Sequence, residues 1–164
     1  MKAKLAALFA ALTATLAFGH GGVEIGPNGG RILEFSKNET MHGEVTVKDG
    51  KFNVAILDKD MKPVKVAEQT LAATSAAGET GKGTKIEVTR TESGFTLPAV
   101  KDGEWLILQF RENAKGKAIT ARMHYDTGTC EECKEPEWLC KCKAADKKGE
   151  KKEEPKKDAG KKVK

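Results

Sequence analysis

The feature that most constrains the fold of this chain is the alternation of apolar and polar residues in short segments separated by turn sequences. Residues 44–48 and 51–57 both alternate, and Asp49-Gly50 stands between them. The apolar members of the two segments are Val45, Val47, Phe52, Val54 and Ile56. A period of two is typical of a half-buried strand, and Asp-Gly between two such segments predicts a β-hairpin.

Short segments of similar character follow one another at a spacing of roughly ten residues. The other predicted strands cover residues 31–35, 64–68, 70–74, 85–90, 95–100, 105–110 and 117–125. This pattern, with little helical periodicity, predicts a single Ig-like antiparallel β-sandwich of about seven or eight strands. The more continuous apolar segments 54–57 and 106–108 are expected in central strands, and Trp105 is expected to pack in the core or at its rim.

The N-terminal segment has the organisation of a secretion signal. Lys2 and Lys4 precede an uncharged apolar run of 14 residues, which is shorter than the roughly 20 that a transmembrane helix needs. Small residues at the −3 and −1 places allow cleavage before His20 or before Phe18. We therefore expect a periplasmic or secreted protein without a transmembrane segment in the mature chain.

The net charge of +5 resides in the two ends of the chain. Residues 146–164 hold nine lysines and five acidic residues, and Lys2 and Lys4 lie in the signal segment, so the remainder carries about −1. A nucleic-acid-binding domain needs a basic surface, so we expect no nucleic-acid partner. The Lys/Glu-rich tail contains one large apolar residue, Val163, and is expected to be disordered.

Four regions follow from these observations. They are a signal peptide at 1–19, a β-sandwich domain at 20–127, a four-cysteine module at 128–144 and a disordered tail at 145–164. The sandwich domain begins with a glycine-rich segment, residues 20–30, called here the glycine-rich entry.

The four-cysteine module is the main candidate site. Cys130, Cys133, Cys140 and Cys142 lie within thirteen residues, and the rest of the chain has no cysteine. Four thiolates can enclose one Zn(II) ion tetrahedrally, and Cu(I) also prefers sulfur. We favour metal binding, because four cysteines in so short a segment are more than the disulfide crosslinking of one short loop needs.

Two other chemistries are compatible with the same residues. Exported cysteines can form two disulfides, which would make the protein a disulfide-stapled interaction or adhesion module without metal. Crossed pairings are then expected, because a Cys140–Cys142 ring would be strained. The third is an oxidoreductase that uses Cys130 and Cys133, but the helix N-terminus and βαβ setting typical of such pairs are missing, and we expect no enzyme.

The histidines form a weaker candidate set of ligands. His20, if it begins the mature chain, offers its α-amino group and its ring nitrogen to one ion. His42 and His124 each follow a methionine, and imidazole and thioether are both ligands for copper. No pair of histidines has helical ligand spacing, so their ordinary role as surface residues is the competing interpretation.

The entry from His20 to Gly30, the segment 57–63 and the C-x2-C…C-x-C ending together resemble a group of small exported bacterial proteins. The resemblance implies a β-rich body, and some similar proteins accompany heavy-metal efflux systems. The expected function is therefore binding of Cu(I) or Zn(II) for buffering or delivery in the cell envelope, with an efflux component as a candidate partner.

Overall fold

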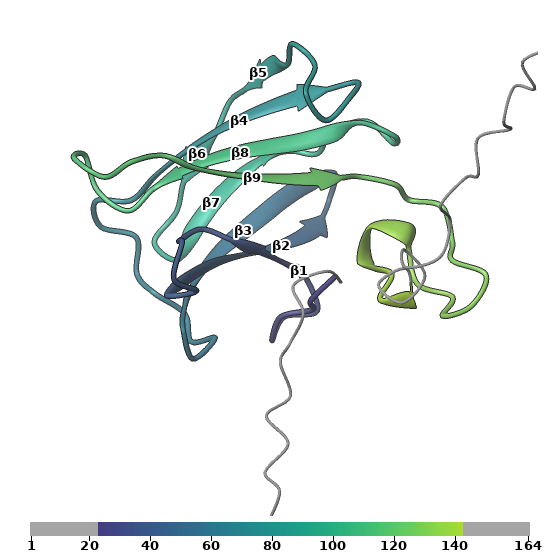
Figure 1. Cartoon of the computed structure of the whole chain (residues 1–164), viewed down its shortest axis with the longest axis horizontal. Helices are drawn as coiled ribbons and strands as arrows, with labels where there is room; N and C mark the ends of the chain where they lie inside the picture. The colour runs from purple at the N-terminus through teal and green to yellow at the C-terminus, as the bar shows by residue number, and fades with distance from the viewer. Residues whose placement is uncertain (1–22, 143–164) are drawn as a thin grey trace, which may run out of the picture.

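The computed structural model describes residues 23–142 of the 164-residue chain, and these form two β-sheets packed face to face (Figure 1). The predicted signal peptide, His20 and the predicted tail lie outside the described residues. Within residues 23–142, the structure contains no helix with the length and apolarity that crossing a bilayer requires.

All strand pairs are antiparallel. The first sheet contains, in order, β1 (Arg31–Glu34), β2 (Met41–Lys48), β3 (Lys51–Asp58), β7 (Gly94–Pro98) and β6 (Thr89–Arg90). The second contains β5 (Thr84–Ile86), β4 (Thr70–Ala76), β8 (Trp105–Arg111) and β9 (Ile119–His124). The order β2-β3-β7-β6 matches strands A-B-E-D of an immunoglobulin-type sandwich, and β4-β8-β9 matches C-F-G. The predicted antiparallel β-sandwich is confirmed.

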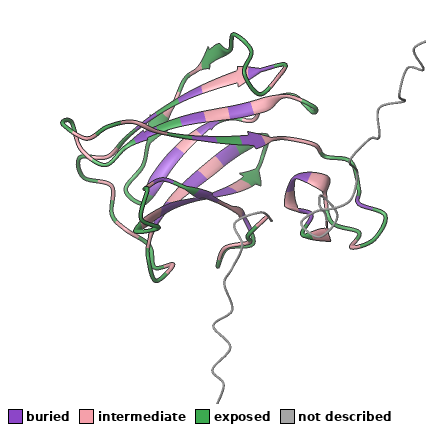
Figure 2. Cartoon of the chain, viewed as in Figure 1, coloured by how far each residue is buried: buried purple, intermediate pink, exposed green. Residues whose placement is uncertain are grey.

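The hairpin formed by β2 and β3 has the predicted turn. Asp49 and Gly50 both have positive φ angles, 51° and 70°, as a two-residue type I′ turn requires. In β3, Phe52, Val54 and Ile56 are buried, and the residues that precede each of them are more exposed, as the colours of the strands show (Figure 2). The period of two in the sequence therefore gives the face that each side chain occupies.

The core lies between the sheets and includes both predicted central strands. β3 lies between β2 and β7, and β8 lies between β4 and β9. Phe35, which follows β1, stacks on Phe110 of β8 with 4.6 Å between the ring centroids. Trp105 is half-buried at the start of β8, where its ring contacts that of His124. The expectation that Trp105 packs in the core or at its rim is wrong, because the next residue, Leu106, takes the inward face of β8 and Trp105 is not among the residues packed against the core.

Two of the predicted strands are wrong in detail. Residues 64–68 form no strand, because Val64 donates a hydrogen bond to Ile56 while Val66 donates one to Glu92, which lies in a different segment. Residues 85–90 are divided between β5 and β6, which belong to opposite sheets. This segment carries the chain from one sheet to the other. Residues 23–142 form nine strands, where the sequence predicts seven or eight.

Candidate metal centre

The first two cysteines lie in a tight turn. The N–H of Lys134 donates to the carbonyl of Cys130 at 3.0 Å, and the N–H of Cys130 donates to the carbonyl of Glu135 at 2.9 Å. The turn closes because Lys134 adopts a left-handed backbone conformation with φ of 63°. Cys130 and Cys133 therefore place their sulfur atoms on the same side of this turn.

A short 3-10 helix, η1 (Glu137–Leu139), positions the second pair of cysteines. Pro136 precedes it with φ of −56°, which suits the start of a helix, and Cys140 follows it directly. The N–H of Cys140 donates to the carbonyl of Glu137 at 3.2 Å. The chain becomes extended at Cys140, and Cys142 follows two residues later.

The four sulfur atoms form one cluster, and all lie within 4.8 Å of one another. The Sγ of Cys140 is 3.2 Å from that of Cys130 and 3.7 Å from that of Cys133. Four sulfurs around one Zn(II) ion, each about 2.3 Å from the metal, would be about 3.8 Å apart in a regular tetrahedron. The cluster thus has the size that a four-coordinate soft metal ion needs.

No disulfide links the four cysteines. The structure therefore does not support the alternative in which two disulfides staple the module. The thiols instead donate hydrogen bonds in series, from Cys133 to Cys140 and from Cys140 to Cys130.

The series ends at a sulfur that is stabilised as a thiolate. The pKa of Cys130 is lowered to about 7, because the backbone N–H of Cys133, the thiol of Cys140 and the backbone N–H of Glu132 donate to its sulfur. The pKa of Cys142 is raised, because its thiol donates a hydrogen bond to Cys133 and because burial disfavours the charged form. Since the thiolate is the form that binds metal, Cys130 supplies a ligand near neutral pH.

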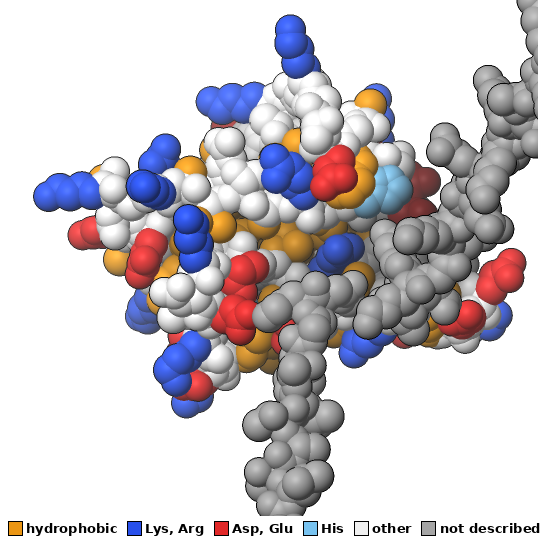
Figure 3. All heavy atoms as spheres, viewed as in Figure 1, with side chains coloured by type: hydrophobic (Ala, Val, Ile, Leu, Met, Phe, Trp, Pro, Cys, Tyr) orange, Lys and Arg blue, Asp and Glu red, His pale blue; other side chains and the backbone are white. Residues whose placement is uncertain are grey.

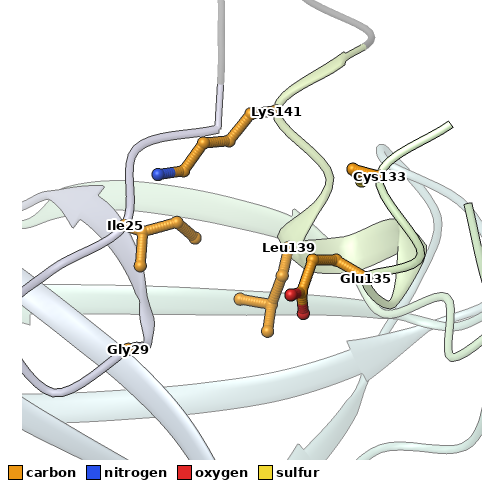
Figure 4. A pocket seen from close by; sticks show the side chains of 6 residues that line it. All are labelled: Ile25, Gly29, Cys133, Glu135, Leu139 and Lys141. Atoms are coloured by element: carbon orange, nitrogen blue, oxygen red, sulfur yellow. The ribbon is translucent and has the colours of Figure 1, made fainter.

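The two halves of the cluster differ in exposure. Cys130 and Cys140 are buried, 5% and 2% exposed, whereas Cys133 and Cys142 are half-buried. A hollow of about 500 Å³ lies beside Cys133 and separates the glycine-rich entry from the four-cysteine module. Ile25 and Gly29 line one side of it, with the module on the other (Figure 4).

Aromatic contacts attach the module to the end of the sandwich where β9 ends (Figure 1). Trp138 of η1 is 7% exposed and belongs to the hydrophobic core. Its ring packs against that of Tyr125, which in turn packs edge-on against Phe52 of β3. The cysteines are therefore carried by a segment that shares the core of the sandwich.

Polar contacts hold the same segment. The Nη1 of Arg31 donates to the carbonyl of Trp138 at 3.2 Å, and Thr127 donates through its backbone and its hydroxyl to Asp102. Burial lowers the pKa of Arg31, and the bonds from Thr127 lower the pKa of Asp102.

Lys, Arg, Asp and Glu side chains are interspersed on the face shown in Figure 3.

The structure does not bring His42 and His124 together. His42 is buried on β2 opposite Leu57, with its Nδ1 3.3 Å from a carboxylate oxygen of Glu34. His124 ends β9 at the other end of the sandwich, where its Nε2 lies 3.1 Å from the carbonyl of Gly103. Among residues 23–142, the cysteines form the group of ligands that could hold a metal, and neither histidine belongs to it.

Sequence reasoning missed Glu44, which supports one wall of the hollow. Its carboxylate is fully buried on β2 and accepts hydrogen bonds from the N–H of Asn28 at 2.7 Å, from the side-chain amide of Asn28 and from the N–H of Gly30. A Cβ added at Gly26 would lie 2.6 Å from this carboxylate. The signal in the sequence was the Gly-Pro-Asn-Gly-Gly segment, which needs an acceptor for its backbone N–H groups.

No protein-family model, no curated protein and no solved structure matches this chain. The geometry of the four-cysteine module is therefore the feature of the molecule that points to a function.

Proposed function

We propose that this protein binds one transition-metal ion through Cys130, Cys133, Cys140 and Cys142, and that it buffers or delivers the ion in the cell envelope. The observation that carries the proposal is the clustering of four sulfur atoms within 4.8 Å of one another without a disulfide. Four thiolates select soft or borderline ions, and Zn(II) and Cu(I) are the two candidates.

The location of the cluster supports a binding role. Two of the cysteines are buried and two are half-buried, and the thiolate character of Cys130 supplies a ligand without a change of fold. A bound ion would connect the turn at Cys130 to the segment that follows η1. The place of action in the envelope rests on the predicted signal peptide, and an efflux component of the envelope is the proposed recipient.

Metal content tests the proposal. The full chain, purified without chelators and with its thiols reduced, should bind one equivalent of Zn(II) or Cu(I), and competition with chromophoric chelators should give the preferred ion. Replacing the four cysteines with serine should abolish binding. The matched control is the double variant His42→Ala/His124→Ala, which should keep the full equivalent. A chain isolated from the producing cells without reductant that is four hydrogens light in mass and holds no metal would contradict the proposal.

The expected export has a separate test. N-terminal sequencing of the mature protein from the producing cells should begin at His20 or Phe18, and a chain that keeps Met1 would contradict the envelope location. A start at His20 would also supply the free amino group that a second metal site at this residue needs.

A further inference from the structure

We infer that the metal ion is exchanged through the hollow beside Cys133, with Cys133 as the first sulfur to be displaced by a thiol of the acceptor. The inference rests on the proposed function, and it adds the route and the order of ligand exchange.

Burial of the sulfurs gives the direction of exchange. Cys130 and Cys140 are 5% and 2% exposed, so an incoming donor cannot reach the ion from their side without opening the core. Cys133 and Cys142 are half-buried. Of the four, Cys133 is the one that lines the hollow. An acceptor in the hollow therefore meets this sulfur first.

The hollow has the size of a ligand site. Its volume of about 500 Å³ falls within the roughly 300–1,000 Å³ of typical small-molecule pockets. Its lining combines the apolar side chains of Ile25 and Leu139 with the charged groups of Glu135 and Lys141, which lie on the module side (Figure 4). Charges of both signs beside an apolar floor suit a short peptide segment or an amino-acid-sized thiol.

The exchange step conserves charge and electrons. The bond from the metal to the Sγ of Cys133 breaks as a bond from the metal to the acceptor sulfur forms. The acceptor enters as a thiol, and its proton passes to the released Cys133. Neither the metal nor any sulfur is oxidised or reduced. Repetition of the step at the other sulfurs transfers the ion completely.

Zinc-transfer kinetics on the full chain test the route. The Zn(II)-loaded protein is mixed with free cysteine in one arm and with a synthetic Cys-x-x-Cys peptide in the other, and the zinc retained by the chain is measured after rapid gel filtration. We expect the rate to rise in proportion to acceptor concentration. If Ile25→Trp slows transfer to the peptide alone, the hollow accepts a cysteine-containing segment of a protein. If it slows transfer to both the peptide and free cysteine, the hollow accepts small thiols as well.

Variants at Ile25 alter the hollow without touching a sulfur. Ile25→Trp should fill it and slow transfer at least about fivefold, and Ile25→Ala should keep or raise the wild-type rate. Ile86→Trp is the matched control, because Ile86 is a similarly half-buried isoleucine on the edge strand β5. All variants should keep their zinc affinity within about threefold. Equal rates for Ile25→Trp and Ile86→Trp, or a rate independent of acceptor concentration, overturn the route.

Alkylation tests the order of exchange. When the Zn(II)-loaded chain is treated with iodoacetamide and digested, mass spectrometry should show modification at Cys133 before the other three cysteines. Initial modification at Cys130, Cys140 or Cys142 overturns the assignment. A wild-type chain that binds neither Zn(II) nor Cu(I) overturns both proposals. If the chain binds only Cu(I), the same tests are run on the Cu(I)-loaded protein, and a metal-loaded chain that fails them overturns the route alone.

Discussion

Asn28 and Glu44 are joined by two hydrogen bonds, from the backbone N–H at 2.7 Å and from the side-chain amide at 2.6 Å. The pair folds the glycine-rich entry over the outer face of β2 and buries the carboxylate completely. Gly30 adds a third donor at 3.0 Å. Since Gly29 lines the hollow beside Cys133, this contact also fixes one wall of the proposed exchange route.

Glu44→Gln is expected to destabilise the protein by about 1.5–3 kcal/mol, because hydrogen bonds to a charged acceptor are lost and the new amide group faces N–H donors. Urea unfolding followed by circular dichroism measures the change in the free energy of unfolding. Glu68→Gln, at an exposed position, is the control and should change the stability by less than about 0.5 kcal/mol. Equal effects of the two substitutions would show that the buried network adds no stability.

Trp138 should contribute more to stability than Trp105, although both are tryptophans near one end of the sandwich. Trp138 belongs to the core, whereas Trp105 is half-buried. Trp138→Ala is expected to cost about 3–5 kcal/mol, and Trp105→Ala should cost clearly less. Denaturant unfolding of the two variants provides the measurement. If Trp138→Ala were the milder change, the module would not share the core of the sandwich.

The sequence predicts those parts of the structure that depend on neighbours along the chain. The alternation in β3 gives its buried face, and Asp49-Gly50 gives the hairpin, because both depend on local geometry. The cluster of four sulfurs is predictable for the same reason, since the cysteines lie within thirteen residues.

Contacts between distant segments are what the sequence does not predict. Glu44 occupies a polar position of an alternating strand, so its expected environment is water. It becomes buried only because residues 26–30 fold across that face. Arg31 and Trp138 are 107 residues apart, and no local pattern connects them. The division of 85–90 between two sheets likewise depends on the packing of the whole sandwich.

Asp58 should make the stability depend on pH in the acid range. The N–H groups of Lys62 and Asp60 each donate to its carboxylate at 2.9 Å, and these bonds, the one from Lys62 first, lower the pKa of Asp58. Because the folded-state pKa lies below the unfolded value of about 3.9, this stabilisation is present above that pH and is lost as the pH falls through the folded-state pKa.

Asp58→Asn should therefore remove part of the decrease in the urea unfolding midpoint between about pH 5 and pH 2. The decrease is measured as the difference between the midpoint at the higher pH and the midpoint at the lower pH. Asp60→Asn is the matched control, because it changes an exposed carboxylate that pairs with Lys59, and it should keep the wild-type dependence. An Asp58→Asn variant whose midpoint falls with acid as steeply as that of the wild type would refute the assignment.

Lys134 directly follows Cys133 and closes the turn that contains the first two cysteines, and its backbone is in a left-handed conformation with φ of 63°. Glycine adopts this conformation without a steric penalty, whereas a β-branched residue is a clear outlier there. Lys134→Gly should therefore keep the metal affinity of the wild type. Lys134→Val should weaken it about tenfold, which corresponds to about 1.4 kcal/mol, because strain opposes the placement of Cys133 beside Cys130. Chelator competition on the reduced full chain measures both affinities. Because the two variants remove the same charge, a difference between them reports the backbone, and equal affinities would mean that the turn does not position the sulfur.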